Sequence, residues 1–396
     1  MKFLRVALTL TLLLSLSINF AQAQTPERFS FTGSGYGHGV GLSQIGAKAR
    51  ALAGESATAI LNYYYKDVVI APVVDSHTIR VNIGDTLQEF SVMSARPKAV
   101  VQVFSGDLPL GTPGLPLLTS VAKQKIDFRI EDNLVAVEAI RSPALTIRWF
   151  GPAPIISVTQ NGKTDRYKYG QIQVKVVKGA LEVTTSLSLH NQYLRGISEV
   201  SSAWPSAVLE AQAIAARSYA LSKIGKIKPS CDCHVYAHVS DQNFVGFSKE
   251  AEPKFGKLWK AAVSRTNIDT ATGLAILSQG KPIQAFYFSS SGGATQTTLD
   301  AWGQATAYTQ SVPDPAGLDP KNNPRFAQWN ASVEQNVIAT AFLLPDIITL
   351  EIVSRNTAGA VTYIKGTSSN GSTKLLRGDT FRSRVKIPSP YFTLAS

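Results

Sequence analysis

The sequence predicts an α+β protein with a mixed, β-rich core, a few helices around a groove and an accessory β module. The stretch from His77 to about Ser188 is rich in Val, Ile and Thr and is interrupted by Gly and Pro, which is typical of successive strands. Apolar residues at helical spacing follow Trp204 and Pro205. Helices set beside mixed strands, without regular alternation, indicate α+β architecture.

The N-terminal residues have the composition of a secretory signal peptide. A basic start precedes an uncharged apolar run from Val6 to about Phe20, and Ala21-Gln22-Ala23 supplies small residues for cleavage after Ala23. The alternative is a membrane anchor, but the run is shorter than the roughly 20 apolar residues that span a bilayer. We therefore expect a secreted protein that meets the membrane only through this transient segment.

The composition of the 396-residue chain limits its partners. The hydrophobic fraction of 44% suffices for a packed core, and the length allows two domains or one large one at roughly 150 residues each. Removing Lys2 and Arg5 with the signal lowers the formal net charge from +12 to +10, which favours adsorption to polyanions. The basic residues form no tight block or nucleic-acid module, so we expect no nucleic-acid partner.

Two segments are predicted to be helices on the clearest patterns. The first runs from Ala57 to Lys66. The second follows Trp204-Pro205, where proline suits the first turn, Ser201 or Ser202 can cap it and Gly225 can end it. We also expect a helix near Ala251 to Val263, strands at Leu274 to Leu277 and Ile283 to Phe288, a polar loop through Pro320 and a strand-rich C-terminal stretch.

A glycine-rich segment is the first candidate site, and it reads Gly33-Ser34-Gly35-Tyr36-Gly37-His38-Gly39-Val40-Gly41-Leu42-Ser43-Gln44. Glycines at alternate positions let the backbone approach a ligand closely. His38, Ser43 and Gln44 add one titratable group and several hydrogen-bonding atoms. The alternative is a tight turn without a ligand.

A single carboxylate, Glu199, precedes the second predicted helix in the segment Tyr193-Leu194-Arg195-Gly196-Ile197-Ser198-Glu199-Val200. The apolar neighbours Ile197 and Val200, with Trp204 close by, favour desolvation of this carboxylate. Desolvation would raise the pKa of Glu199 and suit it to general acid catalysis. The alternative is a glutamate that only interacts with the positive end of the helix dipole.

The segment Cys231-Asp232-Cys233-His234 offers Cys231, Cys233 and His234 as ligands for a structural zinc. Its spacing is tighter than Cys-x-x-Cys, and a disulfide or two free thiols are the alternatives. A fourth segment, Ser289-Ser290-Ser291-Gly292-Gly293-Ala294-Thr295, follows an apolar strand and offers small hydroxyls that can bind sugar hydroxyls, or else forms an ordinary polar turn. It lacks the Gly-x-Ser-x-Gly pattern of a serine hydrolase.

Taken in order, these segments resemble the SpoIID/LytB family of sporulation and cell-wall proteins. The resemblance covers most of 166–396 together with 30–67. It is carried by Tyr193-Leu194-Arg195-Gly196, Glu199, Trp204-Pro205, Ala211 to Ala220, Asp241-Gln242, Gly246, Thr272-Gly273, Ser289 to Gly293, Thr295 and Trp302. Several separated motifs in the correct order are more specific than any one of them.

The resemblance implies a lytic transglycosylase acting on peptidoglycan glycan strands in the cell wall or periplasm, with Glu199 at the position of the catalytic glutamate. No cofactor is then required. One carboxylate suffices, because a primary hydroxyl of the muramic acid attacks its own anomeric carbon while Glu199 gives and then takes a proton. The substrate groove would use His38, Ser43, Gln44, Gln212, Arg217, Asp241, Gln242, Ser290, Ser291 and Thr295.

The chain departs from the family pattern in the position of its glycine-rich segment. Family members commonly carry Gly-His-Gly-Val-Gly-Met-Ser-Gln near the C-terminus, whereas here Gly37 to Gln44 lies near the N-terminus with Leu42 in place of Met. We infer a circular rearrangement in which the first segment packs against the last. The loop from Gly196 to Glu199 is also shorter than in many members.

The expected division of the chain is a signal peptide at 1–23, a segment at 24–70 that completes a SpoIID-like domain, an accessory β-rich module at 71–165 and a core at 166–396. Two other functions are compatible with the same motifs. One is a non-catalytic wall-binding protein that enhances an N-acetylmuramoyl-L-alanine amidase, which would then be its partner. The other is a zinc amidase, which needs an open metal site.

Overall fold

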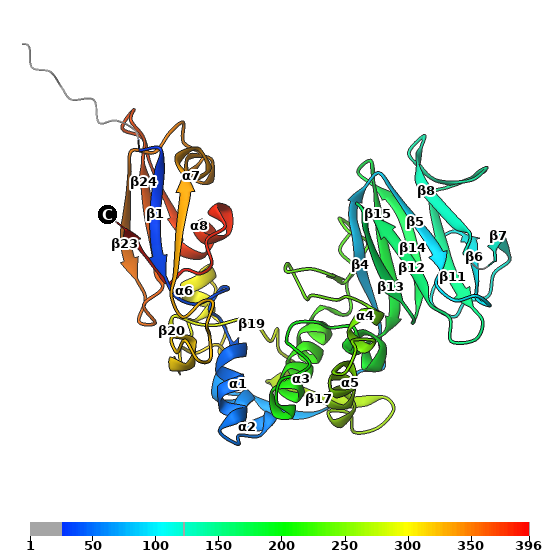
Figure 1. Ribbon diagram of the computed structural model, residues 1–396, viewed down its shortest axis with the longest axis horizontal. Helices are drawn as coiled ribbons and strands as arrows, with labels where there is room; N and C mark the ends of the chain where they lie inside the picture. Colours follow the sequence, from blue (N-terminus) through cyan, green and yellow to red (C-terminus); the bar gives the residue numbers. More distant parts are fainter. Residues whose placement is uncertain (1–25, 122, 396) are drawn as a thin grey trace, which may run out of the picture.

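The computed structural model describes residues 26–121 and 123–395, so the predicted signal peptide lies outside the described residues. Figure 1 shows a U-shaped molecule in which a helical base carries two arms. One arm comes from the middle of the sequence, and the other combines the first described residues with the C-terminal part. Within the described ranges, no helix is both long and apolar enough to cross a membrane.

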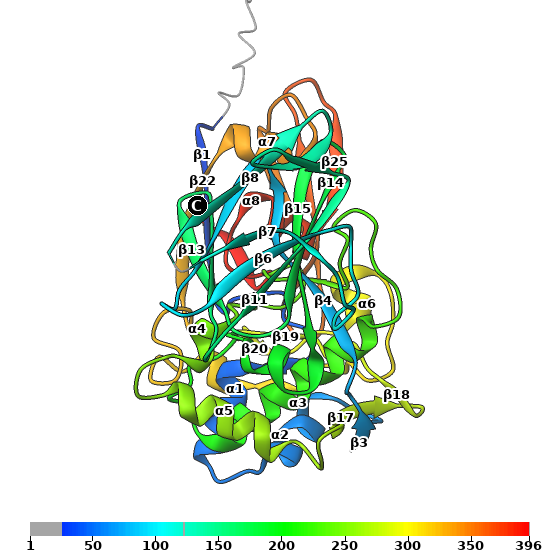
Figure 2. The same cartoon turned by 90° about the vertical axis from the view of Figure 1, so that its right-hand side faces the viewer.

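The arm from the middle of the sequence is a β-sandwich (Figures 1 and 2). One sheet has six strands in the order β10 (Ile140–Ser142), β9 (Leu134–Val137), β8 (Lys125–Glu131), β5 (Glu89–Ser94), β12 (Ile156–Gln160) and β13 (Lys163–Tyr167). The other has seven, in the order β16 (Val235–Tyr236), β4 (Thr78–Leu87), β15 (Ala180–Ser188), β14 (Gln171–Val177), β11 (Ala144–Phe150), β6 (Val100–Ser105) and β7 (Pro116–Ser120). The predicted strand-rich stretch is therefore confirmed.

The sandwich extends beyond the predicted module of 71–165. Strands β14 and β15 lie in the segment assigned to the core, yet they pair with β11 and β4 of the sandwich. At the other end, β3 (Val69–Val74) pairs with β17 (Thr272–Ser278) of the base. Strand pairing between distant segments sets these boundaries, and local composition does not report it.

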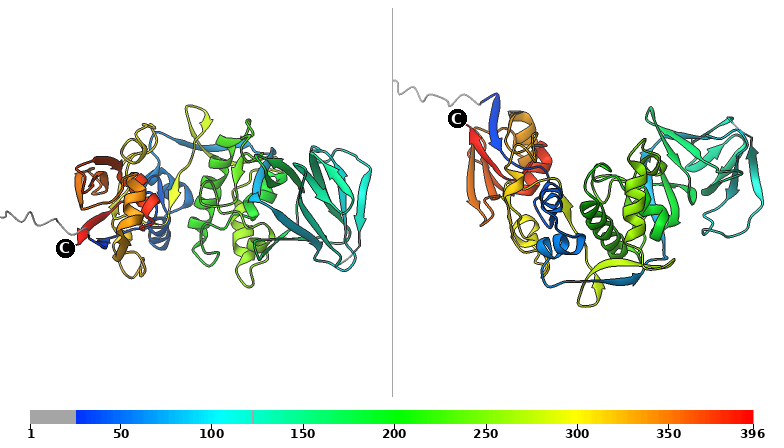
Figure 3. Two further views of the ribbon diagram at one scale, coloured as in Figure 1. Left: turned by 90° about the horizontal axis from the view of Figure 1, so that it is seen from above. Right: turned by 60° about the horizontal axis from the view of Figure 1, so that its bottom comes forward.

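The base is built around α3 (Ser206–Lys223), which is buried on two sides. Its Leu209 and Ala213 join the core of the sandwich, whereas Val208 and Ile214 join a second core. The remaining elements of the base are α1 (Gln44–Leu52), α2 (Ala57–Tyr64), α4 (Phe247–Glu250), α5 (Gly256–Arg265), β2 (Leu42–Ser43), β18 (Lys281–Pro282) and β19 (Tyr287–Phe288). Figure 3 shows α3 between α1 and α5.

Several predicted boundaries differ from those observed. Pro205 itself is the N-cap of α3, and neither predicted serine caps the helix. The predicted helix at 251–263 begins later, as α5 at Gly256, after the short α4. The predicted strand at 283–288 forms regular pairing only at β19, because β2 offers just two residues for it.

The second arm brings the two ends of the described chain together. The strand β1 (Arg28–Gly33) lies between β22 (Trp329–Glu334) and β26 (Phe392–Ala395), which confirms that the first segment packs against the last. Its core includes Phe31, Phe381 and Phe392. The other elements of this arm are β23 (Thr349–Arg355), β24 (Val361–Thr367), β25 (Thr373–Arg377), β20 (Gly293–Ala294), β21 (Pro313–Asp314), α6 (Thr298–Trp302), α7 (Gln335–Phe342), α8 (Gly378–Val385) and η2 (Pro315–Gly317).

A buried ionic cluster joins the base to the sandwich, and it contains Arg217. This arginine is fully buried and donates to Asp75 Oδ2 at 2.6 Å, to Asn267 Oδ1 at 2.6 Å and to the carbonyl of Leu274 at 2.9 Å. Asp75 also binds His190 of the π-helix η1 (Leu189–Tyr193). Asp75 lies between β3 and β4, and His190 lies between β15 and α3. At both places the chain crosses between the base and the sandwich. Arg217, which the sequence predicts to bind substrate, is therefore buried in a cluster of internal contacts.

We predict that Arg217→Met lowers the free energy of unfolding by about 3–5 kcal/mol, because it leaves the buried Asp75 carboxylate without its charged partner. Chemical denaturation measures this loss. Arg265→Met is the matched control, since Arg265 pairs with Glu210 while half-exposed and should cost less than about 1 kcal/mol. Equal effects of the two substitutions would contradict the role given to the cluster.

Candidate functional site

Glu199 is held by a short ladder between two loops. The Ser198 N–H donates to the Asn243 carbonyl at 2.8 Å, and the Val245 N–H donates to the Gly196 carbonyl at 2.9 Å. At the end of this ladder, Glu199 Oε1 accepts the Asn243 N–H at 2.6 Å and the Tyr287 hydroxyl at 3.0 Å. The carboxylate is thus fixed by two donors while Glu199 stays partly exposed.

The surroundings of Glu199 raise its pKa. Burial is the largest cause, and the hydrogen bonds from Asn243 and Tyr287 oppose it because they favour the ionised form. Ile197 and Val200 are both buried, as the apolar motif around Glu199 predicts. The result is a carboxyl group that holds its proton at a higher pH than an ordinary glutamate and still reaches solvent, which suits general acid catalysis.

A chain of buried hydrogen bonds continues from Glu199 through Tyr287. Gln242 Nε2 donates to the Tyr287 hydroxyl oxygen at 3.0 Å, and the Tyr193 hydroxyl donates to Gln242 Oε1 at 2.8 Å. Burial raises the pKa of both tyrosines well above the ordinary value, so both keep their protons. Gln242, which the motif predicts as a groove residue, is therefore hydrogen-bonded to Tyr287, and Tyr287 in turn donates to Glu199.

Sequence reasoning missed Tyr287. It lies in a run of apolar residues that predicts a strand, and nothing in its local pattern distinguishes it from core tyrosines. Its partner Glu199 is separated from it by 88 residues in sequence. A pattern confined to a few residues could not have shown this pair.

The loop of His38 is placed against the same strand. Its following residues form β2, in which Leu42 pairs with Tyr287. The His38 ring lies 5.2 Å from the Trp302 ring and 5.6 Å from the Phe288 ring, measured between centroids. Burial lowers the pKa of His38 to about 4, so the imidazole is neutral at neutral pH. The strand β19 therefore contacts both residues, since Phe288 lies beside the His38 ring and Tyr287 donates to Glu199.

The carboxylate of Asp241 is fully engaged in structural contacts. It accepts the Tyr219 hydroxyl at 2.8 Å, the Lys228 ammonium at 2.7 Å and the Tyr236 N–H at 2.9 Å. These bonds fix the loop that leads to Gln242 and Asn243. Asp241, which the sequence predicts to contact substrate, thus anchors this loop.

Six other predicted groove residues lie inside the protein. Ser43 caps α1, and Gln44 Nε2 donates to Gln212 Oε1 at 3.2 Å, which links α1 to α3. The rest come from the serine-rich segment, where Ser291 Oγ donates to Asp314 Oδ2 at 2.7 Å and Thr295 bonds to neighbouring backbone. The four residues Ser290, Ser291, Thr295 and Gln212 are fully buried, so their side chains contact other parts of the protein and do not reach the solvent.

Cys231 and Cys233 form a disulfide, which was one of the alternatives open from the sequence. A sulfur in a disulfide is not a thiolate and cannot serve as a zinc ligand. The Nδ1 atom of His234 accepts the Arg80 N–H at 2.9 Å. No cluster of three or more potential metal ligands occurs within 26–121 and 123–395. The structure thus corrects the zinc assignment of these three residues.

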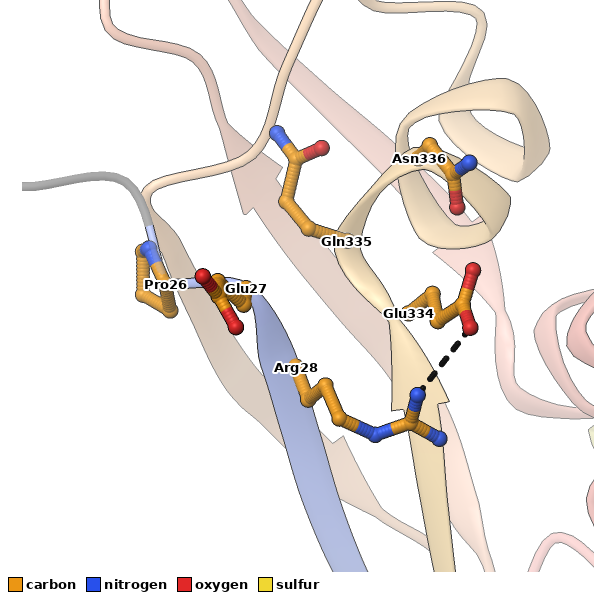
Figure 4. Close-up of a pocket in the computed structure, with 6 residues that line it drawn as sticks. All are labelled: Pro26, Glu27, Arg28, Glu334, Gln335 and Asn336. Carbon is orange, nitrogen blue, oxygen red and sulfur yellow. Dashed lines mark hydrogen bonds and ion pairs between the residues drawn. The ribbon is translucent and has the colours of Figure 1, made fainter.

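One surface pocket lies far from Glu199, at the rim of the arm that holds both chain ends. Figure 4 shows Arg28 of β1 pairing with Glu334 of β22, with Pro26, Glu27 and Gln335 around them. Arg28 and Glu334 are both largely exposed, and their separation is 3.1 Å. An exposed ion pair of this kind contributes little energy.

Residues 178–272 match the family model described as SpoIID: Stage II sporulation protein. This segment is a SpoIID domain. It contains Glu199, Gln242 and Asn243, whereas Tyr287 and His38 lie outside the matched residues. The family is associated with peptidoglycan-related lytic activity, and the match indicates a sporulation-related cell-wall protein. No curated protein and no solved structure matches the chain.

We predict that Tyr287→Phe raises the pKa of Glu199, because it removes a hydrogen bond that favours the ionised carboxylate. Carbon-13 NMR of labelled glutamate carboxyl groups measures the titration directly. Tyr169→Phe is the control, since the Tyr169 hydroxyl makes a comparable hydrogen bond to Glu250 elsewhere. An unchanged or lowered pKa in Tyr287→Phe would show that the hydroxyl does not act on Glu199.

We also predict that Glu199→Gln gains stability over the wild type as the pH rises. The raised pKa means that ionised Glu199 is disfavoured in the folded state, so wild-type stability falls as the pH passes from the unfolded pKa, about 4.3, through the folded pKa. Glutamine does not titrate. Thermal unfolding at several pH values measures the difference, and a gap that stays constant with pH would disprove the desolvation of Glu199.

Proposed function

We propose that this protein is a secreted peptidoglycan lytic transglycosylase in which Glu199 alone acts as acid and base. One observation carries the proposal. A partly exposed carboxyl group with a raised pKa is held by two neutral donors, Asn243 and Tyr287, with no cation paired to it among the described residues. Such a group can give up a proton and take one back within a single catalytic cycle.

The reaction needs one proton in each direction. Protonated Glu199 transfers its proton to the glycosidic oxygen as the bond to the anomeric carbon breaks. The resulting carboxylate is stabilised by the Asn243 N–H and the Tyr287 hydroxyl. It then removes the proton from the primary hydroxyl of the same muramic acid, whose oxygen closes on the anomeric carbon to form an anhydro end. Glu199 is protonated again, and no water is consumed.

The lone carboxylate favours this reaction over ordinary hydrolysis. Retaining and inverting glycosidases use a second carboxylate within about 5–10 Å of the acid. The nearest candidate by motif, Asp241, already binds Tyr219, Lys228 and a backbone N–H. An intramolecular hydroxyl replaces that second group, since attachment to the substrate supplies the proximity that a protein nucleophile would otherwise provide.

The basic charge of the chain is compatible with a substrate in the wall. The formal net charge is +12 for the whole sequence, and anionic wall polymers attract such a protein. This attraction is diffuse, so it would increase residence on the wall without selecting a particular bond. In this proposal, Glu199 and its surroundings select the glycosidic bond that is cleaved.

We predict that Glu199→Gln lowers the release of anhydro-muropeptides from purified peptidoglycan by about 10²–10⁴-fold, the usual contribution of a positioned acid–base group. Mass spectrometry of the digest measures the products. The amide oxygen can still accept from Asn243 and Tyr287, so the fold should be kept. Glu210→Gln is the matched control, because Glu210 lies on α3, which begins shortly after Glu199 in the chain, and pairs with Arg265 at the surface.

Two results would contradict the mechanism. Undiminished product release by Glu199→Gln would remove Glu199 from the chemistry. Absence of anhydro products from the wild type, combined with stimulation of an added N-acetylmuramoyl-L-alanine amidase, would replace the enzyme by the non-catalytic enhancer.

A further inference from the structure

The loop that carries the acid of the proposed mechanism, residues 194–200, is held at both ends by side chains of α4 and α5, and we name it the acid loop. Trp259 of α5 is fully buried, and its Nε1–H donates to the Leu194 carbonyl at 3.0 Å. Lys249 of α4 is buried, and its ammonium group donates to the Val200 carbonyl at 2.7 Å. Two neighbouring helices thus fix the first and the last carbonyl of the acid loop.

The two donors also contact each other. The Lys249 ammonium lies 5.7 Å from the centroid of the Trp259 ring, within the range of a cation–π interaction. The Glu252 carboxylate lies 3.8 Å from the same ammonium and accepts the Ser202 hydroxyl at 2.6 Å. Ser202 is fully buried and lies two residues beyond the acid loop. The three side chains of Lys249, Trp259 and Glu252 therefore form one connected group, which we name the clamp.

The chain leads directly from the ladder beside Glu199 to Lys249. Val245 is the last residue of that ladder, and Gly246 then turns the chain into α4 with a φ of +58°. A side chain at this position would be strained at that φ, and its Cβ would lie 2.7 Å from the Tyr167 ring. Because so few residues separate them, the position of Lys249 is tied to that of the ladder.

Placing a lysine in the clamp costs free energy, because its charge is buried. Burial lowers the pKa of Lys249, and the Glu252 carboxylate opposes this effect. A charged donor also makes a stronger hydrogen bond to a carbonyl than a neutral donor does. Val200 directly follows Glu199, so the strong bond restrains the backbone next to the acid.

We propose that Lys249 is a positioning residue, which keeps the Glu199 carboxyl group against its two donors, Asn243 and Tyr287, by fixing the backbone that follows. This inference deepens the proposed function and rests on it. Lys249 acts through the acid loop and takes no part in the proton transfers. Without its bond to the Val200 carbonyl, the end of the acid loop is free to move, and Glu199 turns toward solvent.

The titration of Glu199 tests this positioning directly. Lys249→Met removes the ammonium group and keeps a side chain of similar length. We expect the pKa of Glu199 to fall toward the ordinary value, about 4.3, because burial is the largest cause of its rise and the freed carboxyl group gains solvent. Tyr287→Phe should shift the same pKa in the opposite direction. Carbon-13 NMR measures the titration, and the Glu199 signal is identified by its absence from Glu199→Gln.

The kinetic constants give a second measurement. Lys249→Met should lower kcat for the release of anhydro products by about 10–100-fold and leave KM nearly unchanged, since the acid is displaced and the rest of the groove is kept. Lys249→Arg keeps a charged donor and should recover most of the lost rate. Arg355→Met is the matched control, because Arg355 of β23 donates to the Phe392 carbonyl at 2.7 Å in the other arm. The control should leave the Glu199 pKa and both kinetic constants close to those of the wild type.

The results that would overturn the inference are separate from those that would contradict the proposed function. An unchanged or raised pKa of Glu199 in Lys249→Met, with kcat no lower than in the control, would overturn the positioning role alone. If Lys249→Met does not fold, Lys249→Gln takes its place, since its amide group is one atom further from the Val200 carbonyl, and the same fall in pKa is expected. Absence of anhydro products from the wild type would contradict the proposed function, and the titration alone would then decide the role of Lys249.

Discussion

The hydrogen bond from the Tyr287 hydroxyl to Glu199 is the interaction on which the candidate site depends. Tyr287 reaches Glu199 with its side chain, and its strand pairs with β2 of the N-terminal segment. The bond therefore requires that three distant parts of the chain meet. It also acts on the carboxyl group, since it opposes the rise in the pKa of Glu199 that burial causes and stabilises the ionised form.

Most of the polar motif residues are buried inside the protein and do not contact Glu199. Arg217, Gln212, Ser291 and Thr295 are fully buried, and their side chains fix helices and loops by hydrogen bonds to partners inside the protein. Ser290 is also fully buried, and its backbone hydrogen-bonds to that of Tyr36. A buried polar group needs such partners, and removing one of a pair leaves the other unsatisfied. This explains how polar motif residues can lie near Glu199 without facing the solvent. Gln242 is the member that stays close to the chemistry, through Tyr287.

The sandwich packs against the base of the molecule. It shares a core with α3, since Leu209 and Ala213 pack with strand residues such as Val81 and Val183. The cluster of Asp75, His190 and Arg217 fixes the two crossings between sandwich and base. The sandwich is therefore fixed against the base at both crossings.

The sequence by itself determined the α+β class, the strand-rich middle, the long helix after Pro205 and the position of Glu199 among apolar residues, because these depend on local composition and spacing. It also indicated that the first segment packs against the last, from the displaced glycine motif. Only the tertiary structure decided which polar side chains face inward, which sulfur atoms join, where the sandwich ends and that Tyr287 donates to Glu199. These outcomes depend on contacts between residues far apart in the chain, and such contacts form only when packing brings their partners together.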